Sequence, residues 1–127
     1  MSNYSILIVE DTDDLRELLH IMLEQRGYNV IEAADGSQAV QEATEKRPDL
    51  ILMDLNLPVL SGLDAVRQIR RVRGTSSVPI IAVSALDSRS GRPDAIVAGC
   101  NEYLRKPIDQ GKLDDLLTTY LHKPSVA

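Results

Sequence analysis

The chain of 127 residues is 43% hydrophobic and 26% charged, with a formal net charge of −5. This length suffices for one domain with its own core, and the negative charge argues against direct contact with nucleic acid. A single cysteine, Cys100, excludes an internal disulfide framework and a cysteine-cluster metal site. Because neither a secretory signal nor a membrane-length apolar run is visible, we expect one cytoplasmic domain over residues 1–127, with a core at about 5–121 and no membrane contact.

Three runs of four apolar residues predict buried strands, at residues 6–9, 50–53 and 80–83. None of these runs alternates with polar residues, so both faces of each strand must be covered, as in a parallel sheet between two layers of helices. Residues 28–33 and 102–105 are further strand candidates and are expected to be shorter or partly exposed.

Apolar residues with helical spacing follow the predicted strands. The first and last helices share an i, i+3, i+4, i+7, i+8 pattern, formed by Leu15, Leu18, Leu19, Met22 and Leu23 in one and by Leu113, Leu116, Leu117, Tyr120 and Leu121 in the other. The second helix is marked by Ala39, Val40 and Ala43, and the third by Val66 and Ile69. Gly27, Gly74 and Gly99 stand where helices are expected to end.

The fourth helix is predicted less clearly than the others. Residues 87–93 contain few good helix formers, and Gly91 and Pro93 are helix breakers, so we expect this helix to begin late, near Pro93. Ser61 and Asp64 form the pattern of a capping box at the start of the third helix. Strand and helix thus alternate five times, which predicts an α/β fold: a doubly wound, five-stranded parallel sheet with five helices.

Polar residues follow four of the predicted strands, at the sheet edge where open α/β folds bind their ligands. Glu10 and Asp11 follow the first strand, Asp54 the third, Ser84 the fourth and Lys106 the fifth. Three carboxylates in one crevice repel one another, and a bound cation relieves that repulsion. Because the ligands are oxygens, with no histidine or cysteine nearby, the expected cation is Mg²⁺, or Mn²⁺ in its place.

These side chains together predict a phosphoryl-transfer site. The Lys106 ammonium and the Ser84 hydroxyl can bind the oxygens of an anionic group on Asp54, which is a carboxylate nucleophile beside the metal. Each residue also has an ordinary alternative: Asp54 and Ser84 as helix caps, the acidic pair as helix N-terminal charges, and Lys106 as a solvated surface charge. The convergence of four strand ends on one crevice favours the phosphoryl-transfer interpretation.

The chain resembles the receiver domains of two-component response regulators, the CheY-like family. The motifs that carry the resemblance are Ile-Leu-Ile-Val-Glu-Asp at 6–11, Leu-Ile-Leu-Met-Asp-Leu-Asn-Leu-Pro at 50–58, Gly62, Val-Ser-Ala at 83–85 and Tyr-Leu-Arg-Lys-Pro at 103–107. The match runs from about Ser5 to Leu121, and the intervals between Asp54, Ser84 and Lys106 agree with the family pattern. The resemblance implies a flavodoxin-like receiver fold and a role in phosphorelay signalling.

The resemblance also assigns a role to each carboxylate. It implies that Asp54 is the phosphoacceptor. It implies that Mg²⁺ is bound directly by Asp11, by Asp54 and by the backbone carbonyl of Asn56, while Glu10 acts largely through water.

The remaining site residues take their expected roles from the same resemblance. Ser84 and Lys106 are expected to contact the phosphoryl oxygens, and the peptide bond between Lys106 and Pro107 is cis in similar proteins. Tyr103 resembles a switch aromatic that turns inward when Ser84 moves toward the phosphoryl group, and its alternative is a half-buried strand tyrosine. Phosphorylation would then switch a protein-interaction face.

The expected partner is a histidine kinase or a histidine phosphotransfer protein. Ile21 on the first helix is a candidate contact for this partner; the alternative is that Ile21 lies at the flank of the core.

The chain is not expected to be an enzyme beyond its own phosphorylation from a donor and slow autodephosphorylation. One alternative is a metal-dependent aspartyl-phosphate hydrolase, but Asn56 stands where such an enzyme needs a second carboxylate. Another is a receiver fragment of a larger hybrid protein.

Overall fold

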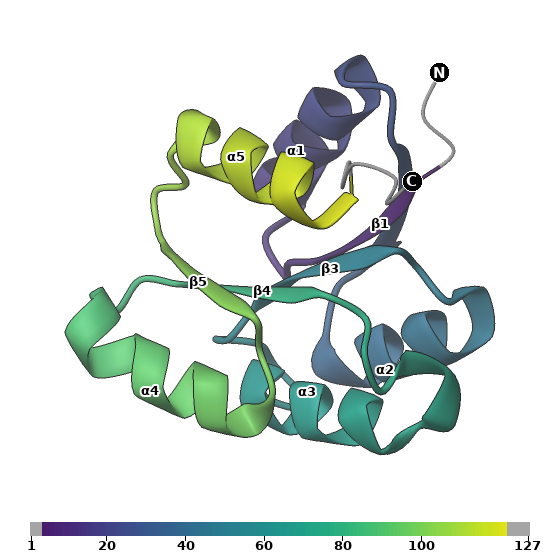
Figure 1. Cartoon of the computed structure of the whole chain (residues 1–127), viewed down its shortest axis with the longest axis vertical. Helices are drawn as coiled ribbons and strands as arrows, with labels where there is room; N and C mark the ends of the chain where they lie inside the picture. Colours follow the sequence, from purple (N-terminus) through teal and green to yellow (C-terminus); the bar gives the residue numbers. More distant parts are fainter. Residues whose placement is uncertain (1–3, 122–127) are drawn as a thin grey trace, which may run out of the picture.

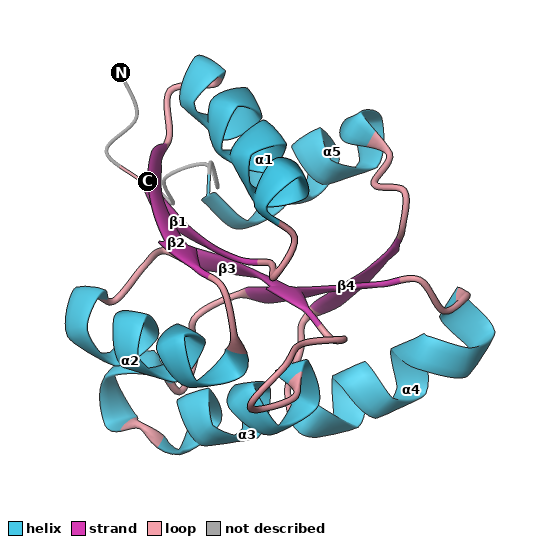
Figure 2. Ribbon diagram, turned by 180° about the vertical axis from the view of Figure 1, so that it is seen from behind, coloured by secondary structure: helices cyan, strands magenta, loops and turns pink. Residues whose placement is uncertain are grey.

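The computed structural model describes residues 4–121 and contains one parallel five-stranded sheet with strand order β2-β1-β3-β4-β5. In chain order the elements are β1 (Ser5–Val9), α1 (Asp13–Gln25), β2 (Asn29–Ala33), α2 (Gly36–Lys46), β3 (Leu50–Asp54), α3 (Gly62–Arg71), the short 3₁₀ helix η1 (Arg73–Thr75), β4 (Ile80–Ser84), α4 (Ser88–Ala98), β5 (Glu102–Arg105) and α5 (Gln110–Leu121). Helices α1 and α5 cover one face of the sheet, and α2, α3 and α4 cover the other (Figures 1 and 2). The predicted fold is confirmed.

The sheet separates two aliphatic cores, because successive side chains of a strand point to opposite faces. In β1, Ile6 and Ile8 pack with α1 and α5, whereas Leu7 and Val9 pack with α2, α3 and α4. Strands β3 and β4 are buried along their whole length. This double burial explains why the sequence shows continuous apolar runs, and it holds the strand ends at one edge in fixed positions.

The helix ends agree with the predicted capping and glycine signals, with one exception described below. Ser61 caps α3 by accepting a hydrogen bond from the Asp64 backbone N–H at 3.2 Å. Gly27 and Gly99 follow α1 and α4 with φ angles of 90° and 123°, which glycine adopts without strain. The prediction for Gly74 was wrong: α3 ends at Arg71, and Gly74 lies in η1.

The late start predicted for α4 was also wrong, because this helix begins at Ser88. Asp87 supplies the missing signal: its carboxylate accepts a hydrogen bond from the Ser90 backbone N–H at 2.9 Å and caps the first turn. Gly91 is required by close packing, since a Cβ there would lie 2.1 Å from the Tyr103 hydroxyl. Pro93 is exposed on α4, where its ring is accommodated within the helix.

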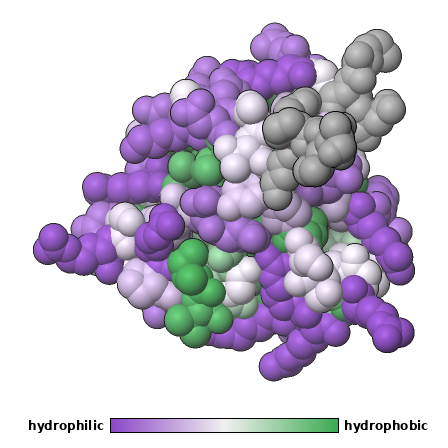
Figure 3. Space-filling model, in the orientation of Figure 1, coloured by the Kyte–Doolittle hydropathy of each residue, from purple (hydrophilic) through white to green (hydrophobic). Residues whose placement is uncertain are grey.

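Helix α4 is held to the sheet by small residues only. Its buried residues are Gly91, Ala95 and Ala98. Its larger apolar side chains face outward, with Ile96 42% and Val97 85% exposed, and Figure 3 shows hydrophobic surface gathered over this helix. Burying small side chains removes little apolar area from water, so α4 is stabilised less by packing than α1 or α5.

Candidate functional site

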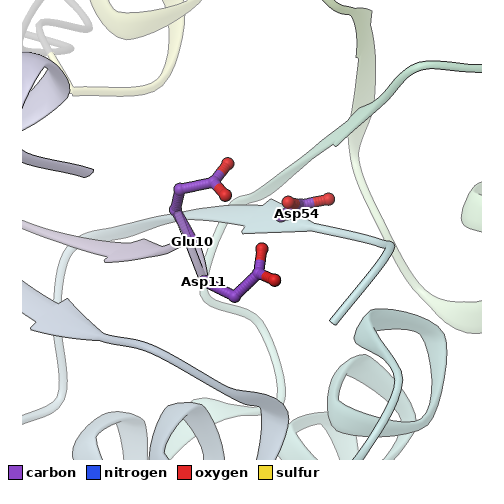
Figure 4. Close-up of side chains that lie close together, drawn as sticks. All are labelled: Glu10, Asp11 and Asp54. Carbon is purple, nitrogen blue, oxygen red and sulfur yellow. The ribbon is translucent and has the colours of Figure 1, made fainter. Parts of the chain in front are cut away.

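Three carboxylates gather where β1 and β3 end (Figure 4). Glu10 follows β1 and Asp54 is the last residue of β3; they are 2% and 3% exposed, whereas Asp11 faces solvent. Each of the three can present an oxygen within 4.8 Å of the others. The structure therefore brings together the acidic residues that the sequence predicted.

Among the residues that the structure describes, the ammonium of Lys106 is the cation bonded to the acidic cluster. Its Nζ donates hydrogen bonds to Asp54 Oδ2 at 2.9 Å and to Glu10 Oε1 at 3.1 Å. Burial lowers the pKa of Lys106, but the hydrogen bonds and charges of Asp54 and Glu10 together outweigh it and raise that pKa above its ordinary 10.5. Lys106 is thus positively charged at neutral pH. The peptide bond between Lys106 and Pro107 is cis.

One lysine leaves the cluster with a negative excess, and its geometry fits Mg²⁺. A Mg²⁺ ion with bonds of about 2.1 Å spans about 4.2 Å between opposite oxygens. The carboxylate oxygens here lie within 4.8 Å of one another, so small side-chain rotations bring them to that separation. Asp54 Oδ1 also accepts a hydrogen bond from the Asn56 backbone N–H at 2.9 Å, which fixes the orientation of this carboxylate.

Ser84 and Tyr103 meet at a shared residue, Leu86. Ser84 is buried at the end of β4, and its Oγ accepts a hydrogen bond from the Leu86 backbone N–H at 3.1 Å. The Tyr103 hydroxyl donates to the Leu86 carbonyl, and Tyr103 is only 7% exposed. In this structure Tyr103 therefore already lies inward, so its burial is not a change that awaits phosphorylation.

A groove beside Lys106 contains Leu18, an exposed residue of the apolar pattern in the first helix. The groove lies between α1 and the segment that leads into α5, has a volume of about 450 Å³ and is lined by Leu15, Leu18, Leu19, Met22, Lys106, Pro107, Ile108 and Gln110. Leu18 belongs to the apolar pattern of the first helix, yet it is 63% exposed. Ile21, the predicted contact, is 47% exposed and lines a separate polar hollow. Leu18 has the same helical spacing as buried Leu19 and Leu23, so no sequence signal separates it from them.

The sequence matches the family described as the response regulator receiver domain over residues 6–118, and the chain belongs to this family. It is a receiver domain of two-component signalling with the CheY-like fold. It is 34% identical to the polar-differentiation response regulator DivK of Brucella anthropi, over 92% of this chain and 95% of that protein. The chain spans about half, 51%, of another relative, the alkaline phosphatase synthesis transcriptional regulatory protein PhoP of Bacillus subtilis, with 31% identity over 98% of this chain.

Two solved structures are similar over nearly the whole chain. The receiver domain of sensor histidine kinase PA1611 from Pseudomonas aeruginosa, with a magnesium ion coordinated in its active site cleft, has a TM-score of 0.87 and 40% identity and covers 96% of this chain and 100% of its own. The receiver domain of Ssk1, co-crystallised with the histidine phosphotransfer protein Ypd1 from Saccharomyces cerevisiae, has a TM-score of 0.86 and 32% identity, covering 94% and 90%. Within residues 4–121, no helix is both long and apolar enough to cross a membrane.

The carboxylate excess at this site predicts an unusual stability change for Asp11→Asn. Removing one of three mutually repelling charges should raise the unfolding temperature in EDTA by about 3 °C, corresponding to ~1 kcal/mol. The gain should shrink in millimolar Mg²⁺, because a bound cation already relieves the repulsion in the wild type. Thermal unfolding followed by circular dichroism in both buffers measures the difference.

The matched control is Asp14→Asn, which removes an exposed carboxylate in the first turn of α1 but outside the cluster. That change should lower the unfolding temperature slightly, since acidic residues stabilise a helix N-terminus. Equal effects of Asp11→Asn and Asp14→Asn, or an Asp11→Asn gain that Mg²⁺ leaves intact, would contradict the account of charge repulsion.

Proposed function

We propose that Asp54 accepts a phosphoryl group from a phosphohistidine of a partner protein, with Mg²⁺ as cofactor. The observation that carries the proposal is the Asp54 carboxylate itself, buried at a strand end, held by the Lys106 ammonium and the Asn56 N–H, and flanked by two further carboxylates. Such a buried acidic group needs cations around it, and a phosphoryl group arriving with Mg²⁺ meets that requirement.

Transfer breaks the P–N bond of the donor, forms a P–O bond to Asp54 and returns the bonding pair to the imidazole nitrogen. Bound Mg²⁺ supplies positive charge that offsets the repulsion between the carboxylates and the phosphoryl group. Asp11, Asp54 and the Asn56 carbonyl hold the ion in this proposal, and Glu10 acts through water. Lys106 is already in place to bind a phosphoryl oxygen.

The mixed anhydride on Asp54 is hydrolysed slowly in this proposal, so the chain is a signalling switch and not a hydrolase. Asn56 has no acid–base function with which to activate water, and the second site carboxylate, Glu10, is occupied by Lys106 and by the Thr12 backbone N–H. These features support autodephosphorylation without efficient catalysis.

We infer that the phosphoryl donor, a histidine kinase or a histidine phosphotransfer protein, docks in the groove beside Lys106. The groove presents the exposed Leu18 next to the residue that would bind the phosphoryl group, so an apolar helix packed there would bring its histidine to the strand ends. The structure of the Ssk1 receiver with Ypd1 supports a partner of this class.

The proposed response to phosphorylation passes through Leu86. A Ser84 hydroxyl that turns to the phosphoryl group must give up its bond to the Leu86 N–H, and the carbonyl of the same residue accepts from Tyr103. Leu86 precedes α4, whose buried residues are only Gly91, Ala95 and Ala98, so the disturbance reaches a helix that little apolar packing holds in place. The face around α4 is therefore the proposed output surface.

Phosphorylation is tested with acetyl phosphate and Mg²⁺. Intact-mass analysis should show one added phosphoryl group, absent in EDTA and absent from Asp54→Asn, because that variant lacks the nucleophile. Asp64→Asn, at an exposed aspartate in the first turn of α3, is the matched control and should be labelled like the wild type. Labelling of Asp54→Asn to the wild-type extent would refute the assignment.

Donor docking is tested with Leu18→Glu. A charge in the apolar groove should slow transfer from a phosphorylated histidine phosphotransfer protein at least 10-fold, while labelling by acetyl phosphate stays unchanged. The control is Val97→Glu, which places the same charge on α4 at an exposed apolar position away from the groove. Equal slowing by both variants, or none by Leu18→Glu, would place the donor elsewhere.

The switch is tested by hydrogen exchange with beryllofluoride as phosphoryl mimic. The mimic should slow amide exchange across residues 85–99, and Tyr103→Phe should bind it yet lose most of this response, because the hydroxyl bond to Leu86 is gone. Tyr120→Phe, which removes a hydroxyl bonded to Glu102 but leaves the bond between Tyr103 and Leu86 intact, should respond like the wild type. Unchanged exchange across 85–99 in the wild type would show that the output face lies elsewhere.

A further inference from the structure

Arg16 is a cation in an unexpected place. It lies in the second turn of α1, near the positive end of the helix dipole, where a carboxylate is preferred over a cation. Its side chain is nevertheless largely withdrawn from solvent, at 17% exposure. The carboxylates of Asp13 and Glu32 raise the pKa of Arg16 and so favour its charge, and the burial indicates that specific contacts hold the guanidinium where it is.

The guanidinium joins three elements of the fold. Nη1 donates to the Glu10 carbonyl at 2.9 Å, Nη2 to Asp13 Oδ1 at 2.6 Å and Nε to Glu32 Oε1 at 3.1 Å. These acceptors lie directly after β1, in the first turn of α1 and in β2. A planar fork with donors in several directions makes this set of bonds, whereas a lysine ammonium at the end of its flexible chain cannot reproduce it.

The bond to Glu10 bears directly on Asp11. The Glu10 carbonyl belongs to the peptide group between Glu10 and Asp11, so fixing that oxygen fixes the plane from which the Asp11 side chain departs. Glu10 is also held by its own N–H, which donates to the Ala33 carbonyl at 3.1 Å, and by its carboxylate, which accepts from the Thr12 N–H at 3.0 Å. Within residues 4–121, no hydrogen bond restrains the Asp11 carboxylate itself.

We propose that Arg16 is a positioning residue that orients Asp11 for Mg²⁺. This inference rests on the proposed function, in which Asp11 is a direct ligand. With Arg16 in place, the peptide before Asp11 has one orientation and the carboxylate needs only a side-chain rotation to bind. Without it, the peptide must be ordered at the moment of binding, and that ordering weakens the affinity.

The charge of Arg16 acts in the opposite direction. A cation near the acidic cluster repels Mg²⁺, so loss of the charge alone should strengthen binding. Positioning and charge thus predict opposite signs for Arg16→Met. For Arg16→Lys, which keeps the charge but loses the hydrogen bonds of the guanidinium, positioning predicts weaker Mg²⁺ binding and charge predicts no change. The pair of variants therefore separates the two effects.

The experiment is a Mg²⁺ titration of wild type, Arg16→Lys and Arg16→Met, followed by the backbone amide NMR shifts of the segments at 10–12 and 54–56. Loss of a residue that orients a metal ligand typically weakens binding about 10-fold to 100-fold, so Arg16→Lys should need at least ~10-fold more Mg²⁺ for half-saturation. Arg16→Met should also need more Mg²⁺ than the wild type, but less than Arg16→Lys, because the lost positive charge partly offsets the lost positioning. Acetyl phosphate labelling should return to near the wild-type rate at saturating Mg²⁺. Unfolding temperatures, measured in parallel, confirm that each variant is folded during the titration.

Arg67→Lys is the matched control. Arg67 bonds to Asp64 at 2.7 Å with the same i, i+3 spacing near a helix start, but it lies on α3 and makes no hydrogen bond or ion pair with Glu10 or Asp11. The Mg²⁺ affinity of the Arg67→Lys variant should therefore equal that of the wild type. An unchanged half-saturation in both Arg16 variants would reduce Arg16 to a purely structural role. Tighter binding in Arg16→Met with no change in Arg16→Lys would mean that only its charge matters. If Mg²⁺ caused no shifts at 10–12 and 54–56 in the wild type, the proposed metal site itself would be wrong. If the wild type binds Mg²⁺ and the Arg16 variants bind it with the same affinity, the metal site stands and only the positioning role of Arg16 is wrong.

Discussion

The repulsion among three carboxylates at one sheet edge is the constraint on which the site depends. Two of them, Glu10 and Asp54, are almost fully buried, and the ammonium of Lys106 is bonded to both. One cation cannot neutralise three anions, so the site retains a negative charge that favours a divalent ion. The same unbalanced charge that lowers the stability of the domain is what suits it to bind Mg²⁺ and an incoming phosphoryl group.

The rest of the fold holds this arrangement in place. Buried strands fix Glu10 and Asp54 side by side, because β1 pairs directly with β3. The segments that follow these strands are held to different degrees. The turn between β1 and α1 is hydrogen-bonded to Arg16, whereas α4 buries glycine and alanine only. Specific hydrogen bonds near the proposed metal ligands and sparse packing at the proposed output helix suit a domain in which the phosphorylation site is rigid. The surface around α4 can then change when Asp54 is phosphorylated.

Sequence patterns predicted the sheet, the helices and the gathering of Glu10, Asp11, Asp54 and Lys106, because the carboxyl ends of all strands in a parallel sheet lie at the same edge. They did not predict the start of α4, where one Asp87 cap outweighs poor helix formers, or the exposure of Leu18, which depends on how much of α1 is covered by α5. Arg70 illustrates the same limit. Its guanidinium bonds the carbonyls of Val78 and Gly99, contacts that only the tertiary structure brings together.

In the proposed function, the carboxylate of Asp54 itself carries the phosphoryl group. Borohydride reduction of the phosphorylated chain converts an acyl phosphate of aspartate to homoserine, and tandem mass spectrometry of the peptides locates it. We expect homoserine at position 54 alone, and only when Mg²⁺ was present during phosphorylation. Homoserine at position 11, or a phosphoryl group that resists borohydride and remains on a hydroxyl or a histidine, would contradict the proposed function.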